Sequence, residues 1–459
     1  MQNMSLEQIA GAVKGTYCGN ESVKHKNIKG VAIDSRKIED EFLFIPIKGA
    51  RVDGHNFISQ VMKRNALCTL SEHALENVDY PYILVESCEQ ALKDLARYYR
   101  STLDIKVIGI TGSVGKTSTK EMVASILERK YNVLKTSGNF NNEIGLPLTI
   151  FNIREHHEIA VLEMGISEFG EMHRLADIAK PDIAIITNIG LAHMENLGSR
   201  EGILQAKTEM FDHLNPNATI VLNGDDDMLS TVSEVNHQKP VFFGLEEHCD
   251  VFATDLQDLG LDGTGCKIHF FDASFSVTVP TPGRHMVYNA LAGAYVGRIL
   301  GLNLDEIREG IASYIPISGR TNIIRNGTLT IIDDCYNANP ISMKASLDVL
   351  TYGSGRTVAI LGDMFELGPK EKELHYEVGC YAANKSIGRI YCIGDLSKET
   401  YRGANEHLTQ DTLVFHFATK KDFLAQLPNL IAKDDTLLVK ASNGMKFPEI
   451  VESLKTLNF

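Results

Sequence analysis

The pattern of apolar and polar positions divides the chain into three regions. In residues 1 to about 100, short apolar runs alternate with helical stretches, and the runs predict strands at Val31–Ile33, Phe42–Ile47 and Ile83–Val85. No glycine-rich phosphate loop occurs in this region. We therefore expect a mixed α/β unit at the N-terminus.

From Lys106 onward, a short apolar run is repeatedly followed by a glycine turn and a helical period. The runs are KVIGI, IAVLE, IAIIT and TIVLN. Such continuous runs are typical of strands buried on both faces of a parallel sheet, with helices as crossovers. The second region is therefore predicted to be a doubly wound α/β domain.

The segment YIPISGR at residues 314–320 marks an expected domain boundary. Beyond it the alternation resumes with the runs LTIID, TVAIL, RIYCIG and TLLVK, and with a helix near Glu371–Ala383. Asn339 followed by Pro340 predicts the start of another helix. The third region is predicted to be a smaller α/β domain, and the expected domains cover 1–100, 101–315 and 316–459.

Composition and charge restrict the possible partners. With 44% apolar residues, the 459-residue chain can build several cores, while a net charge of −14 opposes nonspecific binding to nucleic acid or anionic membranes. The first residues do not resemble a secretory signal, and no stretch approaches the ~20 apolar residues that a spanning helix needs. The eight scattered cysteines indicate reduced thiols. We expect a cytoplasmic protein without nucleic acid or membrane partners.

The sequence KVIGITGSVGKTSTK at residues 106–120 combines a strand, a glycine loop and a helix. Backbone N–H groups of such a loop hold phosphates, with Lys116 reaching the β- and γ-phosphates and the Thr117 hydroxyl binding Mg²⁺. The strict motif is not met, because its first glycine would fall on Ile110. A tight turn with an incidental Gly-Lys-Thr is the alternative, but the order of elements favours ATP binding.

Two further side chains follow buried strands. Glu163 ends the run IAVLE, at the sheet edge where ligands of open α/β sheets bind, and a carboxylate suits Mg²⁺. A solvated acid at the end of a strand explains Glu163 equally well. His193 follows IAIITNIGLA, and a lone histidine is more often a surface or capping residue than a ligand.

Lys207 lies on the apolar face of a predicted helix, together with Ile203, Leu204, Met210, Phe211 and Leu214. Burial would lower the pKa of its ammonium, and a neutral amine can add CO₂ to form a metal-binding carbamate. From the pattern alone, a lysine that extends to solvent or pairs with a buried acid explains Lys207 better.

Nine motifs in order resemble the Mur ligases: ITGSVGKTSTKEM, SGNFNNEIGLP, VLEMG, TNIGLAH, QAKTEMF, PGRHMVYNA, SGR, DDCYNANP and LGDMFELG. IDSRK and KGARVDGHNFI extend the resemblance over nearly the whole chain. It implies three α/β domains: one that binds a UDP-linked substrate, a central P-loop ATPase domain, and a Rossmann-like C-terminal domain. It also implies a monomeric, ATP- and Mg²⁺-dependent ligase that joins D-alanyl-D-alanine to UDP-N-acetylmuramoyl-tripeptide through an acyl phosphate, in peptidoglycan precursor synthesis.

The resemblance also implies roles for individual residues. Those implied for ATP are Gly112, Ser113, Val114, Gly115, Lys116, Thr117, Ser118, Asn289, Arg320 and Asp334. The implied metal ligands are Thr117, Glu163, His193 and carbamylated Lys207, and the implied catalytic residues are Lys116, Glu163, His193 and Lys207. Those implied for the peptide substrates are Asn139, Asn141, Asn142, Glu143, Tyr336, Asn337 and Asn339. Those implied for the UDP end are Asp34, Ser35, Arg36, Arg51, Asp53 and His55.

Several assignments have alternatives. Asn339 could be only a helix cap, Asp333 competes with Asp334 for the ribose, and the loop that contains Arg51, Asp53 and His55 could be an ordinary charged loop. The chain also departs from the family pattern, since KASN at residues 440–443 stands where a Gly-Ser-Arg is expected.

Three other functions compete with this hypothesis. Another amide ligase of the same architecture, such as the ligase adding the third residue or a folylpolyglutamate synthase, is disfavoured by the resemblance of NNEIG and YNANP. A nucleotide-dependent switch would bind ATP without turnover that depends on D-alanyl-D-alanine. A degenerate ligase is disfavoured because Lys116, Thr117, Glu163, His193 and Lys207 are all present. The pattern does not distinguish lysine from meso-diaminopimelate as the third residue.

Overall fold

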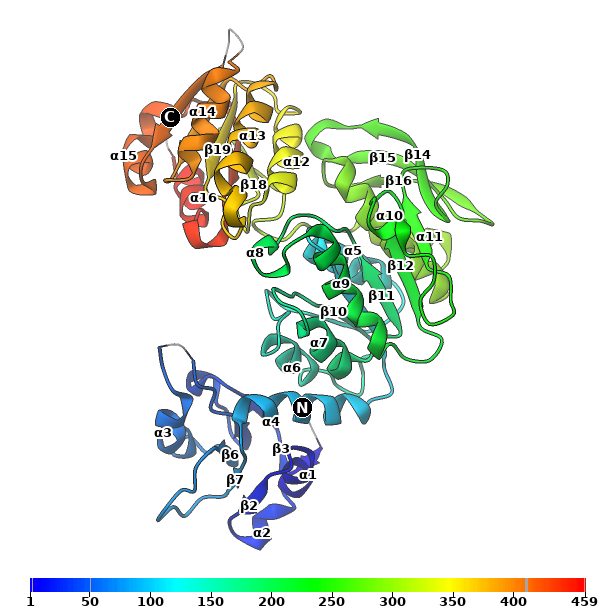
Figure 1. Cartoon of the computed structure of the whole chain (residues 1–459), viewed down its shortest axis with the longest axis vertical. Coiled ribbons are helices and arrows are strands. Elements are labelled where there is room, and N and C mark those ends of the chain that lie inside the picture. The colour runs from blue at the N-terminus through cyan, green and yellow to red at the C-terminus, as the bar shows by residue number, and fades with distance from the viewer. Residues whose placement is uncertain (2, 50, 409–411, 458) are drawn as a thin grey trace.

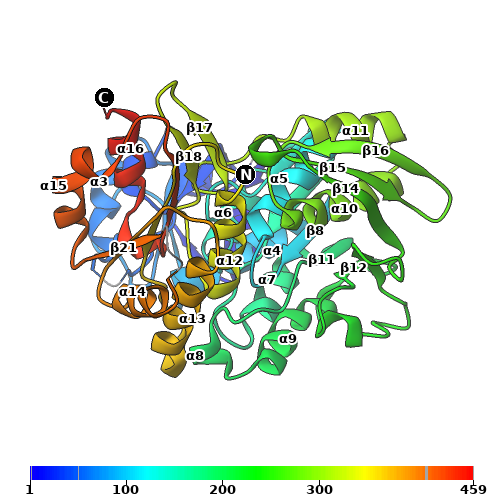
Figure 2. The same ribbon diagram turned by 90° about the horizontal axis from the view of Figure 1, so that it is seen from above.

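The computed structural model describes residues 1, 3–49, 51–408, 412–457 and 459. It contains three α/β units that follow one another along the chain (Figure 1). Helix α4 (Cys88–Ser101) lies between the N-terminal and central units, and the C-terminal unit lies beside the central one (Figures 1 and 2). The predicted class, α/β with three domains, is confirmed.

The N-terminal unit holds a five-stranded sheet in the order β2-β7-β6-β5-β4, parallel except for β2. Its strands are β2 (Thr16–Cys18), β4 (Gly30–Ala32), β5 (Phe42–Phe44), β6 (Cys68–Ser71) and β7 (Tyr82–Leu84), with β1 (Met4–Ser5) and β3 (Asn27–Ile28) forming a separate pair. The helices are α1 (Leu6–Ala12), α2 (Glu21–Lys24), α3 (Ile58–Met62) and α4. The strand predicted to run to Ile47 ends at Phe44, and Pro46, which has no N–H to donate, follows closely.

The central unit is built on a nine-stranded sheet in the order β16-β15-β14-β13-β12-β11-β8-β10-β9. Its strands are β8 (Lys106–Thr111), β9 (Val133–Lys135), β10 (Ile159–Glu163), β11 (Ile183–Ile186), β12 (Thr219–Asn223), β13 (Val241–Gly244), β14 (Val251–Asp258), β15 (Thr264–His269) and β16 (Ser274–Val279). Strands β8 to β14 are parallel, as the apolar runs predict. The carboxyl ends of β10, β8 and β11 are therefore neighbours at one edge.

Two features of the central unit differ from the predictions. The sheet continues into antiparallel β15 and β16, whose alternating burial is typical of strands with one exposed face. The helix predicted to carry Lys207 and Leu214 on one face ends earlier: α9 (Arg200–Thr208) passes into a 3-10 turn, Glu209–His213. At that point Thr208 Oγ1 donates to the carbonyl oxygens of Leu204 and Gln205, a contact that bends helices.

Helices cover both faces of the central sheet, which explains its fully apolar strands. They are α5 (Lys116–Leu127), α6 (Gly145–Ile150), α7 (Glu171–Ala179), α8 (Met194–Leu197), α9, α10 (Arg284–Ile299) and α11 (Leu304–Ala312). Helices α5, α10 and α11 pack into one hydrophobic core, and α6, α7 and α9 share the other with α4. The N-terminal and central units thus have a continuous core.

The C-terminal unit has a six-stranded sheet in the order β17-β18-β22-β19-β20-β21, parallel except for β17. Its strands are β17 (Asn322–Arg325), β18 (Thr330–Asp333), β19 (Thr357–Gly362), β20 (Arg389–Ile393), β21 (Leu413–Phe417) and β22 (Thr436–Lys440). Its helices are α12 (Pro340–Leu350), α13 (Glu371–Ala383), α14 (Ser397–Glu406), α15 (Lys420–Leu430) and α16 (Pro448–Lys455). Asn339 caps α12 in a capping box with Ser342, so the predicted helix start is confirmed.

The eight cysteines all lie in the described ranges and are free thiols, as predicted. Within these ranges, none of the helices combines the length and the apolar character needed to cross a membrane.

Candidate active site

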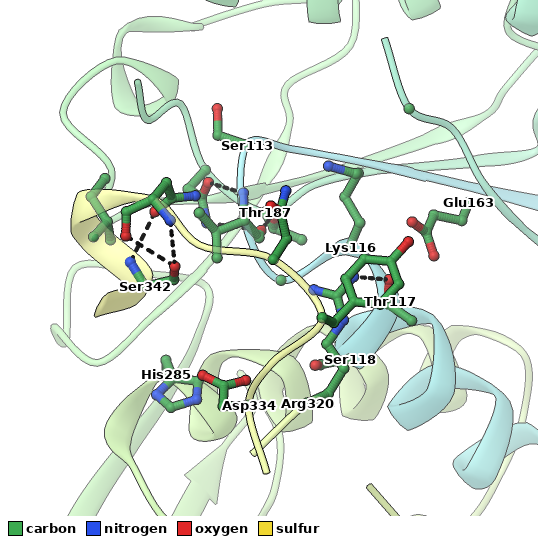
Figure 3. Close-up of a pocket in the computed structure, with 18 of the residues that line it drawn as sticks. Ser113, Lys116, Thr117, Ser118, Glu163, Thr187, His285, Arg320, Asp334 and Ser342 are labelled. Atoms are coloured by element: carbon green, nitrogen blue, oxygen red, sulfur yellow. Dashed lines mark hydrogen bonds between the residues drawn. The ribbon is translucent and has the colours of Figure 1, made fainter. Parts of the chain in front are cut away.

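A cavity of about 590 Å³ lies between the central and C-terminal units. Figure 3 shows side chains from both units facing it. From the central unit it is lined by the loop before α5 and by residues that follow β10 and β11, and from the C-terminal unit by residues around β18, α12 and β22. The predicted site residues among its lining are Ser113, Val114, Gly115, Lys116, Thr117, Ser118, Asn139, Asn141, Asn142, Glu163, His193, Asn289, Arg320, Asp334, Tyr336, Asn337 and Asn339.

The phosphate loop is a tight turn between β8 and α5. Gly112 has a φ of 149°, and a Cβ there would lie 1.9 Å from Thr187 Oγ1, so only glycine fits. The backbone N–H of Val114 donates to Asn188 Oδ1 at 2.9 Å, which ties the loop to the end of β11. Lys116 Nζ donates to the Gly112 carbonyl at 2.8 Å, and burial lowers the pKa of this ammonium despite the opposing charge of Glu163.

Glu163 presents a carboxylate with one unused oxygen. The residue is 1% exposed, and Asn141 Nδ2 donates to Oε1 at 2.8 Å. Oε2 is buried and has no hydrogen-bond donor among the described residues. Lys120 Nζ lies 4.0 Å from Oε2, which is too far for a hydrogen bond, so this oxygen keeps its capacity to bind a further cation. The site therefore fits a hard divalent cation, which prefers oxygen ligands.

His193 is held in the left-handed region, with a φ of 61°, at the start of α8. Its Nδ1 lies 3.2 Å from Oε2 of Glu366, a residue of the C-terminal unit. Burial, and then the charges of Lys116 and Lys207, lower the pKa of the imidazole to about 4. The ring is therefore neutral near pH 7 and can act as a ligand.

Lys207 is 1% exposed and lies on α9. Burial, followed by the charge of Lys116, lowers the pKa of its amine well below the usual value, as predicted. The side-chain amine of Lys207 has no ion-pair or hydrogen-bond partner among the described residues, so the lysine is neither solvent-exposed nor paired with a buried acid. The side chain does not line the cavity itself.

The C-terminal unit contributes an arginine to the phosphate loop. Arg320 Nη2 donates to Thr117 Oγ1 at 3.1 Å, and its guanidinium carbon lies 3.9 Å from the ring centroid of Tyr336. Figure 3 shows Arg320 beside Lys116, Thr117 and Glu163. The buried Nε of Arg320 has no partner among the described residues, which leaves a donor for an anionic ligand.

Asp334, and not Asp333, lines the cavity. Its Oδ1 accepts from the Thr321 backbone, and its Oδ2 accepts from Ser346 Oγ at 2.5 Å and from Lys440 Nζ at 2.6 Å. Asp333 instead accepts from Ser318 and Gly319. Asn443, where the family pattern has an arginine, also lines the cavity.

Several predicted residues lie elsewhere. Glu143 forms ion pairs with Lys93 at 3.0 Å and with Arg174 at 2.5 Å. Glu143, Gly112 and Lys207 are not among the residues that line the cavity. The residues predicted for the UDP end remain in the N-terminal unit, outside this cavity: Asp34, Ser35, Arg36, Arg51, Asp53 and His55.

Two of the carboxylates predicted for the UDP end, those of Asp34 and Asp53, cap short 3-10 helices. Asp34 caps the 3-10 helix Ser35–Lys37, and hydrogen bonds from Arg36 lower its pKa to about 2. Asp53 caps Gly54–Phe57 and lies 2.8 Å from His55 Nδ1. The structure thus shows these side chains as turn-forming groups.

The sequence pattern did not indicate several of the lining residues: Thr187, Asn188, Asn223, Phe243, His285, Tyr288, Phe365, Glu366 and Lys440. Thr187, Asn188 and Asn223 stand at or just after the ends of parallel strands, and that position could have indicated them. Lys440 ends the parallel strand β22 and has the same signal. Glu366 has no such signal, because its position beside His193 depends on how the domains pack.

A phosphate loop on a doubly wound sheet, facing an arginine from a second α/β domain, defines a class of multidomain P-loop enzymes that close over a nucleotide. Family profiles refine this class. They match residues 27–100 (Mur ligase family, catalytic domain), 110–297 (Mur ligase middle domain) and 319–443 (Mur ligase, glutamate ligase domain). The chain belongs to the Mur ligase family.

Individual relatives match more than nine tenths of the chain. It is 38% identical to the UDP-N-acetylmuramoyl-tripeptide–D-alanyl-D-alanine ligase of Bacillus subtilis, over 99% of both chains. Its fold is similar to MurF from Acinetobacter baumannii, with a TM-score of 0.91, 31% identity and 99% of both chains covered. It is also similar to MurF from Thermotoga maritima in complex with ADP, with a TM-score of 0.82, 31% identity, and 93% and 97% of the chains covered.

Proposed function

We propose that the protein joins D-alanyl-D-alanine to UDP-N-acetylmuramoyl-tripeptide at the expense of ATP, in peptidoglycan precursor synthesis. The observation that carries this proposal is the shared cavity, in which Arg320 of the C-terminal unit meets Thr117 of the phosphate loop. The full-length similarity to ligases of that name supports the choice of substrates.

The first chemical step activates a carboxylate. The terminal carboxylate oxygen of the tripeptide attacks the γ-phosphorus of ATP, the bond to the bridging oxygen breaks, and ADP leaves. Lys116, Arg320 and the loop N–H groups neutralise the charge that develops on the phosphoryl oxygens. Asn139, Asn141 and Asn142, which line the cavity beside Glu163, would orient the acceptor carboxylate.

The second step forms the amide. The uncharged amine of D-alanyl-D-alanine attacks the acyl carbon, inorganic phosphate leaves, and the amine proton passes to solvent. Tyr336, Asn337 and Asn339 line the C-terminal side of the cavity and would bind the dipeptide. Asn289 would lie near the adenine and Asp334 near the ribose. Because Asp334 already accepts from Lys440 and Ser346, its effect on the ribose is expected to be secondary.

The residues present fit a magnesium site. Thr117, Glu163, His193 and a carbamate on Lys207 would hold the metal, which would supply charge neutralisation at the phosphates. Carbamylation would change the buried amine of Lys207 from a potential cation into an anion, and the positive charge of Lys116, which acts on Lys207, would stabilise that anion.

The three units would divide the work. Residues 1–100 would bind the UDP-linked substrate through Asp34, Ser35, Arg36, Arg51, Asp53 and His55, residues 101–315 would bind ATP, and residues 316–459 would close over both. The protein would carry out the reaction as a monomer. Eight free thiols support the cytoplasm as the compartment.

The test measures phosphate release with ATP, Mg²⁺ and UDP-N-acetylmuramoyl-tripeptide, with and without D-alanyl-D-alanine, and identifies the products by mass spectrometry. We expect release that depends on the dipeptide and a pentapeptide product, with either lysine or meso-diaminopimelate as the third residue. ATP binding without pentapeptide from either substrate would instead favour another acceptor or a nucleotide switch.

A further inference from the structure

The N-terminal unit contains a histidine, a glutamate and a cysteine whose side chains converge. His55 lies in the 3-10 helix Gly54–Phe57, Glu72 follows β6, and Cys88 is the first residue of α4. His55 Nε2 lies 3.8 Å from Cys88 Sγ, and a carboxylate oxygen of Glu72 lies within 4.8 Å of both atoms. None of the three residues lines the cavity between the central and C-terminal units, so the cluster is separate from the candidate active site.

The contacts of His55 leave Nε2 as the ring nitrogen that can bind a metal. Nδ1 lies 2.8 Å from Asp53 Oδ1, so in the neutral ring Nδ1 carries the proton and Nε2 presents its lone pair. Nε2 faces Cys88 and accepts a long hydrogen bond, at 3.3 Å, from the backbone N–H of Glu72. A carboxylate behind the ring is the arrangement that orients metal-binding histidines in proteins.

The separation of the nitrogen and the sulfur suits a tetrahedral ion. Zn²⁺ binds imidazole nitrogen at about 2.0 Å and thiolate sulfur at about 2.3 Å, which places the two ligand atoms about 3.6 Å apart. The observed distance is 3.8 Å. Glu72 Oε1 accepts from the Cys88 backbone N–H at 2.8 Å, and a carboxylate keeps further lone pairs for a metal. Small movements of the side chains would therefore complete a set of three ligands.

The charges of the cluster also favour a cation. Within the described ranges, no lysine or arginine forms an ion pair with Asp53 or Glu72. Cys88 is fully buried and the His55 side chain is 15% exposed, so water screens these groups only in part. A divalent cation would neutralise the Glu72 carboxylate and a Cys88 thiolate, and the positive end of α4 favours the thiolate. The thiol proton would pass to solvent as the metal binds.

We propose that His55, Glu72 and Cys88 form a site for a divalent transition metal of the Zn²⁺ class. Sulfur and nitrogen donors select such ions over Mg²⁺ and Ca²⁺, which prefer oxygen ligands. A water molecule would complete the four ligands. The site thus differs from the proposed magnesium site in its chemistry as well as in its place.

The metal would tie two loops to the start of α4. This helix lies between the N-terminal and central units (Figure 1), and its buried side belongs to their continuous core. A metal that binds only the folded chain stabilises it by mass action. Since the metal would occupy His55, the exposed Arg36 and Arg51 would make the contacts with the diphosphate of the UDP-linked substrate.

The test titrates the metal-free, full-length protein with Co²⁺, which replaces Zn²⁺ in sites of this kind and has a visible absorption spectrum. A cobalt–thiolate bond adds a charge-transfer band in the near ultraviolet, which a site without sulfur, such as the proposed magnesium site, cannot produce. We expect this band to saturate with a single thiolate-bound Co²⁺ per chain, and Zn²⁺ to abolish it. A wild type without the band would overturn the proposal.

Substitutions assign the band to its cysteine. Cys88→Ala should remove the band, and Glu72→Gln should weaken Co²⁺ binding about tenfold or more while it keeps an acceptor for the Cys88 backbone N–H. Cys249→Ala is the matched control, because Cys249 is also buried and lies with Asp225 and His248 in a second cluster of possible ligands. The proposal is wrong if the band persists in Cys88→Ala, disappears in Cys249→Ala alone, or forms in Glu72→Gln with wild-type affinity.

A third measurement needs no substitution, so it remains decisive if Cys88→Ala folds poorly. Anomalous scattering at the cobalt edge, from crystals of the wild-type protein grown with Co²⁺, should place an ion within bonding distance of His55 Nε2, Cys88 Sγ and the Glu72 carboxylate. Cobalt at other positions only would contradict the site. None of these measurements involves ligase turnover, so failure of this site and failure of the proposed function are distinguishable.

Discussion

Arg320 Nη2 donates to Thr117 Oγ1 at 3.1 Å, although 203 positions separate the two residues in the chain. The contact joins the C-terminal unit to the first turn of α5, where the phosphate loop ends. An arginine here places a permanent positive charge beside the hydroxyl expected to hold the metal. Under the proposed function, this contact would couple closure of the domains to phosphoryl transfer.

Arg320→Met is therefore expected to lower kcat by about 10²-fold or more, since it removes charge stabilisation from the transition state. Steady-state phosphate release measures the effect. Arg325→Met is the matched control, because Arg325 joins the same two units through an exposed ion pair with Asp262 at 2.8 Å. Exposed ion pairs of this kind contribute little to stability, so Arg325→Met should keep a kcat close to that of the wild type. Similar kcat values for the two variants would contradict the role of Arg320.

Glu366 contacts His193 from across the cavity. If His193 binds Mg²⁺ through Nε2, a carboxylate on Nδ1 fixes its tautomer and orientation. Glu366→Ala should then weaken the apparent affinity for Mg²⁺ about tenfold or more, with a smaller change at saturating Mg²⁺. Activity measured over a series of Mg²⁺ concentrations tests this, with Glu373→Ala on α13 as the control. Equal Mg²⁺ dependence in both variants would contradict a role of the Glu366–His193 contact in metal binding.

The N-terminal unit is expected to act through its exposed arginines. The Arg36 side chain is 86% exposed, so its guanidinium is accessible to a diphosphate in spite of its contact with Asp34. Arg36→Met should raise KM for UDP-N-acetylmuramoyl-tripeptide about tenfold and leave KM for ATP unchanged. Lys37→Met, one position further on the same turn, is the control. A change in KM for ATP instead would contradict the proposal that the N-terminal unit binds the UDP-linked substrate and the central unit binds ATP.

The parts of the site that could be predicted are those with a local signal. Runs such as KVIGI and IAVLE are buried on both faces, and this pattern predicts parallel strands. Glu163 ends one of these strands, and Lys116 begins the helix that follows the other. Lys207 could be singled out because a lysine on an apolar helix face conflicts with its surroundings.

Other features depend on contacts between distant segments. Lys440 ends a strand like many lysines, and its pairing with Asp334 follows from the adjacency of β18 and β22. Lys120 belongs to a polar run, TSTKE, and its burial becomes visible only when β9 and β10 pack against α5. The antiparallel strands β15 and β16 have alternating burial, so continuous apolar runs do not predict them.

Lys207 offers a prediction in which stability and activity change in opposite directions. Because its folded-state pKa is lowered, the unfolded chain binds more protons than the folded one between that pKa and about 10.4, so this group makes the free energy of unfolding rise with pH in that window. Lys207→Met should therefore be more stable than wild type at pH 7 in CO₂-free buffer, by at least about 1 kcal/mol, and the difference should shrink toward pH 10. Urea denaturation at several pH values measures it.

The same variant is expected to lose essentially all ligase activity, since methionine cannot form a carbamate. Wild-type activity should fall when CO₂ is removed and recover with bicarbonate, whereas bicarbonate should restore neither Lys207→Met nor Lys207→Ala. Lys398→Met, a change at an exposed lysine, should respond to CO₂ as the wild type does. Full activity of Lys207→Ala would exclude the carbamate. Inactive Lys207 variants beside a wild type indifferent to CO₂ would show that the buried amine acts without carbamylation.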